Sequence, residues 1–315
     1  MNTNKINNTL ITSYTNPDLD GTACAFAYAE LLKKQGVNCV AALFGEPQRE
    51  AKFVLNKFKI TINNADKIKE AWKNVILVDM SDRDSLSSRI KPQQVIEVID
   101  HRKVNEASTF PKARIQIEQV GSAATLIAEK FFEKEITMSK KTSILLLSAI
   151  VSNTVNFKAN VTTDRDRKIA NRIKEKLEFS NDEFLNYITE MFKFKSNIKY
   201  PLKETFISDF KTFHFNKYNL GIAQLEMFGV DNFITSNLVE IKKSLSELKR
   251  EKSLNIIFLS CLDIGEGFNK FIIVDQLSEE KISVVLGVKF IKGIAKKEDM
   301  IMRKEIASIL KQKLI

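Results

Sequence analysis

The chain has 315 residues, is 44% apolar and 28% charged, and contains no apolar run near the roughly 18 residues of a membrane span. These values favour a soluble globular protein of two domains over a membrane protein, and residues 1–8 lack the apolar segment of a secretory signal. The excess of 49 Lys and Arg over 39 Asp and Glu gives a net charge of +10, which attracts phosphate-bearing partners but is also what an AT-rich genome produces.

The first half of the chain alternates predicted strands with predicted helices. A β-rich run at 9–14 stops at the turn signal Asn16-Pro17, and a helix that is apolar on most faces follows at 21–35. The alternation continues with strands at 37–43, 75–78 and 95–99 and with helices at 50–59, 121–130, 141–153 and 164–177. Such an order predicts an α/β fold in which a parallel sheet carries helices on both faces.

The pattern changes near residue 190. Residues 192–201 are rich in Lys, show little periodicity and end at Pro201, so we expect a linker there between domains at 1–191 and 202–315. The second domain should be a smaller α+β unit, with strands at 220–226, 254–262, 271–274 and 282–288 and one long helix near 231–251.

Two carboxylates lie just after the first predicted strand. Asp18 and Asp20 are separated by one residue in a stretch held extended by Pro17. Side chains at i and i+2 of an extended segment point the same way, so each carboxylate could face one of two adjacent metal ions. Asp20 could equally cap the helix that begins at Gly21.

Two further acidic signatures follow the third and fourth predicted strands. Asp79 ends the run 75–78, where it is either a bridging metal ligand or an ordinary turn residue. Asp100-His101-Arg102 ends the strand at 95–99, and His101 is one of only two histidines in the chain. An imidazole beside an acid is a common metal-ligand arrangement in which the acid orients the ring.

These signatures should meet in space, together with Asn153 at the end of a buried predicted helix. The strands of parallel βα units end along one edge of the sheet, where open α/β folds bind their ligands. Carboxylates that converge there with an imidazole predict a divalent-metal phosphoesterase.

The order and spacing of these motifs resemble the DHH superfamily of phosphoesterases and, within it, the manganese-dependent, family II inorganic pyrophosphatases. The resemblance covers nearly the whole chain. It is carried in the first half by NPDLD, LFGEPQREAKFVLNKF, VILVD, VIEVIDHR, EQVGSAATLI, LLLSAIVSNT and TTDRD, and in the second half by SDFK, LGIAQ and KGIAKK.

The resemblance implies specific roles for residues of this chain. It implies metal ligands at Asp18, Asp20, Asp79 and His101, with Asp79 bridging two ions. It also implies that pyrophosphate is bound by Lys211, Lys296 and Lys297. Three positions depart from the family pattern. Tyr14 replaces a ligand His, Asn153 replaces a ligand Asp, and Arg102 replaces the second His of the name motif.

These departures change the chemistry that we expect. A neutral phenol binds metal poorly, and Asn153 keeps a carbonyl oxygen but loses a charge. Transition metals should therefore bind more weakly, and the preference of the site should shift towards Mg²⁺. Arg102 suits phosphate, because its planar guanidinium can contact two oxygens. Whether nearby acids compensate for the lost ligands is an open question for Asp82, Asp84, Asp164 and Asp166.

The leading hypothesis is hydrolysis of inorganic pyrophosphate, or of another small phosphate ester, by water activated by two metal ions, with catalytic roles for Asp79, His101 and Arg102. The cofactor is Mn²⁺ by resemblance, with Mg²⁺ and Co²⁺ as alternatives. The competing hypotheses are a phosphodiesterase acting on short oligonucleotides or cyclic dinucleotides, and a catalytically impaired homologue that binds an anion or a partner protein.

The expected setting of the protein follows from the cysteines and from the resemblance. The chain has an odd number of cysteines, and their spacing is not that of metal ligands: Cys24, Cys39 and Cys261. A reduced, cytoplasmic setting is therefore expected. The resemblance implies a homodimer. We expect no membrane contact and no nucleic acid partner beyond short oligonucleotides.

Overall fold

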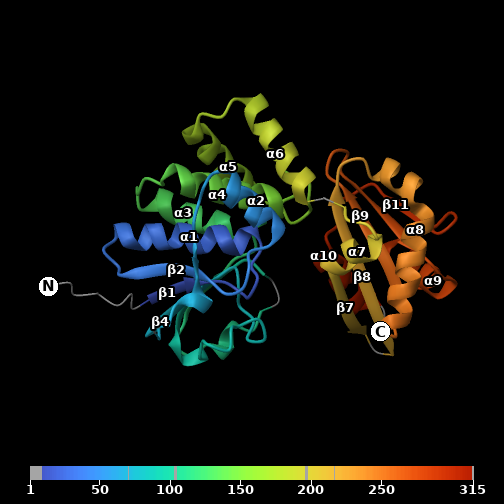
Figure 1. The fold of residues 1–315 in the computed structure, drawn as a ribbon, viewed down its shortest axis with the longest axis horizontal. Helices are drawn as coiled ribbons and strands as arrows, with labels where there is room; N and C mark the ends of the chain where they lie inside the picture. The colour runs from blue at the N-terminus through green and yellow to red at the C-terminus, as the bar shows by residue number, and fades with distance from the viewer. Residues whose placement is uncertain (1–8, 70, 103–104, 196–197, 216, 314–315) are drawn as a thin grey trace. The chain divides into compact units, whose positions relative to one another are not determined.

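The computed structural model describes residues 9–69, 71–102, 105–195, 198–215 and 217–313. The chain divides into two compact units (Figure 1). The first unit comprises residues up to 157 and 161–191, and the second comprises residues 158–160 and those from 192 onward.

The first unit is built on a six-stranded parallel sheet with the strand order β3-β2-β1-β4-β5-β6. Helices α1 and α3 pack on the sheet, and α4 and α5 pack in turn on these helices (Figure 1). The elements of this unit are β1 Thr9–Thr12, α1 Leu19–Lys34, β2 Cys39–Leu43, α2 Arg49–Lys57, β3 Asn63–Asn64, β4 Asn74–Val78, β5 Val95–Asp100, β6 Arg114–Ile117, α3 Ala123–Glu133, α4 Lys140–Asn153, α5 Asp164–Leu177 and α6 Asn181–Lys195.

The opposite face of this sheet packs on a core formed by short 3₁₀ helices and the segments that connect them. Ala65 and Ala107 of these 3₁₀ helices, together with Trp72 and Phe110, cover buried side chains of β1, β4 and β5. Because both faces are covered, the central strands are nearly continuous apolar runs. The predicted α/β class, with a parallel sheet between helical layers, is therefore confirmed.

The second unit contains a five-stranded mixed sheet with the strand order β11-β10-β9-β8-β7, in which only β8 and β9 pair in parallel. One face packs against α7 and α8, and the other packs against α9 and α10. Its elements are α7 Leu202–Ser208, β7 Phe210–Phe215, β8 Tyr218–Met227, α8 Val230–Glu251, β9 Ile256–Asp263, β10 Phe268–Ile273, α9 Gln276–Leu286, β11 Ile294–Lys297 and α10 Arg303–Lys313.

One predicted strand is wrong, because most of residues 282–288 belongs to helix α9. Asp275 caps this helix by accepting a hydrogen bond from the Ser278 backbone N–H, and Gly287 ends it in the left-handed conformation. Ile282, Val285 and Leu286 then face the core with the spacing of a helix. The apolar run ISVVLGV is too short for its periodicity alone to distinguish a strand from a buried helix.

The stretch expected to be a linker contains regular structure. Helix α6 continues to Lys195, and helix α7 begins at Leu202, directly after Pro201. Residues 196 and 197 of the expected linker lie outside the described residues. None of the helices in the described ranges combines the length and the apolar character that crossing a bilayer requires. All three cysteines are buried as free thiols.

Candidate metal centre

Three predicted ligands converge at the carboxyl edge of the parallel sheet. Asp20 lies in the first turn of α1, Asp79 directly follows β4, and His101 directly follows β5. The side chains of all three are buried, and one ligand atom of each lies within 4.8 Å of the others. His101 Nε2 is 3.4 Å from Asp79 Oδ1 and 3.9 Å from Asp20 Oδ2. The strands β1, β4 and β5 are neighbours in the sheet, and this order brings their ends together.

The imidazole of His101 is oriented by a backbone carbonyl. Its Nδ1 lies 2.9 Å from the Val120 oxygen, which can only accept, so Nδ1 carries a proton and the lone pair of the neutral ring is on Nε2. The prediction that Asp100 orients the ring is wrong. Asp100 instead accepts from the His101 backbone N–H at 2.7 Å and from the Ser81 hydroxyl. The resulting tautomer presents Nε2 to the two carboxylates as a metal-binding imidazole would.

Asp20 has a second role, at the start of another helix. Its carboxylate accepts hydrogen bonds from the backbone N–H groups of Ala123 and Ala124, at 2.8 and 2.9 Å, in the first turn of α3. The alternative that Asp20 caps α1 is wrong, because Asp18 is the N-cap of that helix and accepts from the Gly21 N–H at 3.0 Å. The first turn of α3 thus fixes the Asp20 carboxylate. The Gly121-Ser122 signal predicted the start of this helix but not its contact with Asp20.

The electrostatics of the three groups favour a bound cation. Burial, followed by repulsion from Asp79, raises the pKa of Asp20 to about 7, although His101 acts in the opposite direction. A divalent ion between Asp20 and Asp79 would remove this repulsion, and their two negative charges match its charge. Two carboxylate oxygens and one imidazole nitrogen also form a donor set that suits Mn²⁺. The residues present therefore fit a metal ion.

Asp79 adopts an uncommon backbone conformation for a residue with a side chain. Its φ is 51°, in the left-handed region, and its backbone N–H donates to the Ile99 carbonyl of the neighbouring strand at 2.8 Å. Such conformations cost on the order of 1 kcal/mol or more and concentrate at functional sites. The strand end is held in this conformation by its pairing with β5.

Arg102 contacts the same strand end through its guanidinium. Its Nη2 donates to the Asp79 carbonyl and its Nη1 to the Asp82 carboxylate, both at 2.9 Å. The guanidinium carbon also lies 5.6 Å from the centroid of the Tyr14 ring. Burial opposes the charge of Arg102, but Asp79, Asp100 and Asp82 outweigh it and raise the pKa above its ordinary value.

Tyr14 and Asn153, which replace the expected ligands, take part in hydrogen bonds. The Tyr14 hydroxyl accepts from the Asp18 backbone N–H at 3.1 Å, and burial followed by repulsion from Asp18 and Asp79 raises its pKa well above the ordinary value. The phenol therefore stays neutral. Asn153 donates its amide to Asp20 Oδ2 at 2.6 Å, so it touches the predicted ligand cluster as a donor.

The other acids considered for compensation do not join the three ligands. Asp82 pairs with Arg102, and Asp84 and Asp164 are exposed. Asp166 is buried, but its oxygens accept from the Gly121 and Thr163 N–H groups and from the hydroxyls of Thr125 and Thr163. Its role in the described structure is to fasten the starts of α3 and α5.

The predicted phosphate-binding lysines lie in the second unit. Lys211 is on β7 and Lys296 and Lys297 are on β11, which are opposite edges of the five-stranded sheet. Four strand spacings of about 4.8 Å separate these edges, or roughly 19 Å between backbones. Lys296 pairs with Glu298 at 2.7 Å, and Lys297 lies 3.5 Å from Asp299.

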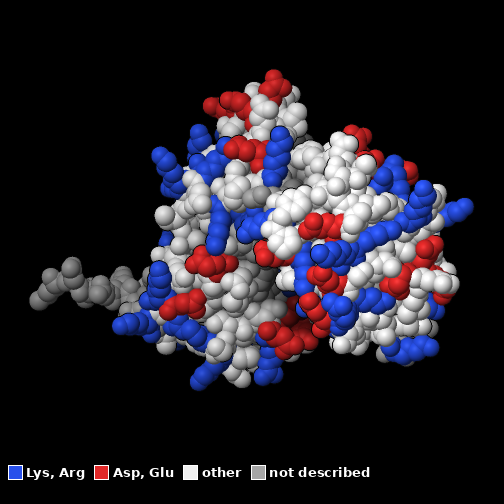
Figure 2. Space-filling view, turned by 45° about the vertical axis from the view of Figure 1, so that its right-hand side comes forward, with Lys and Arg blue, Asp and Glu red and all other residues white. Residues whose placement is uncertain are grey.

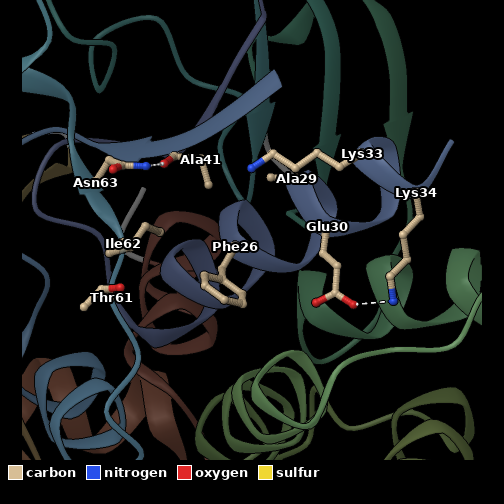
Figure 3. Close-up of a pocket in the computed structure, with 9 residues that line it drawn as sticks. All are labelled: Phe26, Ala29, Glu30, Lys33, Lys34, Ala41, Thr61, Ile62 and Asn63. Atoms are coloured by element: carbon tan, nitrogen blue, oxygen red, sulfur yellow. Dashed lines mark hydrogen bonds and ion pairs between the residues drawn. The ribbon is translucent and has the colours of Figure 1, made fainter. Parts of the chain in front are cut away.

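A separate surface hollow of about 460 Å³ lies beside α1 and contains none of the three ligands (Figure 3). Within it, Glu30 pairs with Lys34 at 2.8 Å and Asn63 donates to the Ala41 carbonyl at 3.0 Å. Basic and acidic side chains are interspersed over the visible surface in Figure 2, so the net charge of +10 does not gather in one patch on that face.

Comparisons with known proteins identify the family of the chain. Residues 8–150 match the family model of the DHH family, N-terminal domain, and residues 189–312 match that of the DHHA2 domain. A Clostridium acetobutylicum protein that carries the name manganese-dependent inorganic pyrophosphatase is 31% identical over 261 residues, which cover 81% of each chain. A Bacillus cereus protein of the same name is 29% identical over 280 residues, covering 88% of this chain and 85% of its own.

Solved structures show the same relationship. A Methanococcus jannaschii structure assigned to the family II inorganic pyrophosphatases has a TM-score of 0.75 and 29% identity, and the match covers 97% of this chain and 99% of that one. An exopolyphosphatase-related protein from Bacteroides fragilis, with a TM-score of 0.51, 13% identity and coverage of 98% and 92%, shares the fold. The chain therefore belongs to the manganese-dependent, family II inorganic pyrophosphatases, a family of hydrolases with DHH and DHHA2 domains.

Proposed function

We propose that the chain hydrolyses inorganic pyrophosphate to phosphate with the help of a divalent metal held by Asp20, Asp79 and His101. The observation that carries the proposal is the convergence of these three ligand atoms within 4.8 Å, in a member of a family named for this reaction. Mn²⁺ is the first choice of ion because the relatives are named for it. Mg²⁺ and Co²⁺ are the alternatives.

The protein groups around the ion would have distinct tasks. A bound divalent ion lowers the pKa of water and polarises phosphoryl oxygens. Asp20 and Asp79 supply the negative charge that holds it, and the Val120 carbonyl keeps the His101 ring turned so that Nε2 faces the carboxylates. The two backbone N–H groups that fasten Asp20 to α3 would keep this carboxylate in place during turnover.

We further propose that Arg102, Lys211, Lys296 and Lys297 bind the phosphate oxygens. The Arg102 side chain is 30% exposed, and its guanidinium carries N–H groups beyond those that bind Asp79 and Asp82. Lys211→Ala should then raise KM for pyrophosphate about tenfold with little change in kcat. The matched control is Lys217→Ala, at an exposed lysine close to the β7–β8 turn, which should change neither constant.

The direct test is release of phosphate from pyrophosphate by the metal-stripped protein after addition of Mn²⁺, Mg²⁺ or Co²⁺. We expect activity that requires one of these ions and that Asp20→Asn abolishes. Short oligonucleotides and cyclic dinucleotides serve as the competing substrates. Turnover of these substrates in preference to pyrophosphate would overturn the proposal in favour of a phosphodiesterase.

The second candidate is a catalytically impaired homologue that binds an anion. Two observations favour it: the neutral Tyr14 hydroxyl, and the Asn153 amide that donates to Asp20 where a further carboxylate was expected. This candidate predicts binding of pyrophosphate in calorimetry but no phosphate release with any of the three ions. Recovery of turnover in Tyr14→His/Asn153→Asp would then identify the two substitutions as the cause.

Two predictions about the setting of the protein accompany the proposal. The family resemblance implies a homodimer, which light scattering would detect as a particle of twice the 35.9 kDa chain mass. A cytoplasmic location is expected for a protein whose free thiols stay reduced, and cell fractionation tests it.

A further inference from the structure

The candidate centre has two sides that differ in how their carboxylates are neutralised. The ligand side consists of Asp20, Asp79 and His101, whose donor atoms gather within 4.8 Å. The arginine side consists of Tyr14, Asp18, Asp82 and Arg102. It adjoins the ligand side through Asp79, whose backbone carbonyl accepts from Arg102. A second metal ion beside Asp79 would have to bind on the arginine side.

The donors that such an ion would need are engaged in the structure of the protein itself. One carboxylate oxygen of Asp18 accepts from the Gly21 N–H as the N-cap of α1. The Asp18 backbone N–H donates to the Tyr14 hydroxyl, which occupies a lone pair of that oxygen. A neutral phenol is also a poor ligand compared with an imidazole or a carboxylate. The arginine side therefore offers few free, charged donors to an ion.

A positive charge is already present on the arginine side. The Arg102 guanidinium binds the Asp79 carbonyl and the Asp82 carboxylate at 2.9 Å, and its Nε lies 3.8 Å from Asp100 Oδ1. Its carbon lies 5.6 Å from the centroid of the Tyr14 ring, so the phenol that replaces a ligand also packs against the arginine. A guanidinium cannot lose its proton at physiological pH, and it would repel a second divalent ion.

We propose that Arg102 takes the place of a second cation, so that the site binds one divalent ion per chain, on the ligand side. Asp20 and Asp79 together balance one divalent ion, while Arg102 pairs with Asp82 and lies 3.8 Å from Asp100 on the other side. The inference rests on the proposed metal site of the pyrophosphatase reaction. It replaces the two ions that the family resemblance implies with one ion and one guanidinium.

The test counts Mn²⁺ ions and measures the distance between them without relying on activity. Equilibrium dialysis with elemental analysis should give one tightly bound Mn²⁺ per wild-type chain. Electron paramagnetic resonance should show the resolved hyperfine pattern of an isolated ion. Tyr14→His/Arg102→His should bind a second Mn²⁺ at least tenfold more tightly than the wild type does, and its spectrum should show spin coupling between two neighbouring ions.

Two controls accompany the count. Arg83→His, at an exposed arginine in the loop that follows β4, should still bind one uncoupled ion. Asp20→Asn should reduce the count to zero and thereby place the counted ion on the ligand side. Circular dichroism establishes that each variant is folded before its metal content is compared.

The outcomes separate this inference from the proposed function. Two spin-coupled ions in the wild-type chain would overturn the inference and leave pyrophosphate hydrolysis intact. A single ion in both the wild type and the double variant would show that Arg102 is not what keeps the second ion out, and would also overturn it. A wild-type chain that binds one Mn²⁺ and releases no phosphate would support the inference while overturning the proposed reaction.

Discussion

Asp18 and Asp20 belong to one short motif, yet they stand on different sides of the candidate centre. Asp18 caps its own helix, α1, and is linked through Tyr14 to a permanent arginine charge. Asp20 binds the first two N–H groups of a different helix, α3, and faces Asp79 and His101, where the neutralising charge has to come from outside the chain. The difference shows that the role of each carboxylate depends on which helix N-terminus it binds, even when the two are neighbours in the sequence.

The largest expected loss of activity comes from substitution of Asp79, which adjoins both the ligand side and the arginine side. Asp79→Asn should lower phosphate release by at least about 10³-fold, because a water in the site has its pKa lowered only while an ion is firmly held. Calorimetry should show the matching loss of Mn²⁺ affinity. Asp84→Asn, at an exposed acid five residues further along, is the control. Unchanged Mn²⁺ affinity in Asp79→Asn would rule out the ligand side as the metal site.

The raised pKa of Asp20 predicts that the metal-free protein loses stability as the pH rises. The pKa is near 3.8 in the unfolded chain and about 7 in the folded one, so the folded state holds this proton more firmly. The stabilising contribution is complete below pH 3.8 and is lost as the pH rises through about 7. At 1.36 kcal/mol per pKa unit, its size is on the order of 4 kcal/mol.

Urea denaturation of the metal-free protein between pH 5 and 8 measures this loss. Asp20→Asn should flatten the profile, and saturating Mn²⁺ should remove the decline because the ion replaces the proton. An identical decline in Asp20→Asn would assign the effect to a different group.

Asn153→Asp should strengthen the ligand side. The change replaces an amide that donates to Asp20 with a further carboxylate, so Mn²⁺ affinity should rise about 10- to 100-fold. The metal-free variant should unfold at a lower urea concentration than the wild type, because three acids then repel one another. Asn160→Asp adds the same charge at an exposed position and should leave the affinity as it is. A fall in affinity would show that the amide itself helps to bind the ion.

The smallest effect on the metal is expected at Asp166, a buried acid that resembles Asp20 in capping helix starts. Asp166→Ala should lower the free energy of unfolding by about 2 kcal/mol, since it leaves the N–H groups of Gly121 and Thr163 without their acceptor. The Mn²⁺ count should not change. A lower count would mean that Asp166 compensates for a lost ligand after all.

The sequence was sufficient to predict the ligand side, because its geometry follows from local patterns. Apolar runs ending at Asp79 and Asp100-His101 identify parallel strands, and such strands place their ends at one edge. The sequence did not predict which groups hold each ligand in place. Nothing near Asp20 in the sequence indicates that it reaches Ala123, or that Val120 rather than Asp100 orients His101, since these contacts depend on how α3 packs.

The second unit shows the same limit of sequence reasoning. Its long helix α8 was predicted because its amphipathic pattern extends over many turns, whereas α9 was mistaken for a strand because its core-facing residues span little more than one turn. Edge strands β7 and β11 were missed because polar residues such as Lys211 and Lys296 interrupt their apolar alternation.

The hydrogen bonds from α3 to Asp20 link the candidate metal centre to the backbone around it. This carboxylate belongs to α1, holds the first turn of α3 and accepts from the last residue of α4. The proton or ion that neutralises this carboxylate therefore determines the strength of the hydrogen bonds that join α1, α3 and α4 at this point. Amide hydrogen exchange at Ala123 and Ala124 should slow when the ion binds, so two backbone amides would report occupancy without any label.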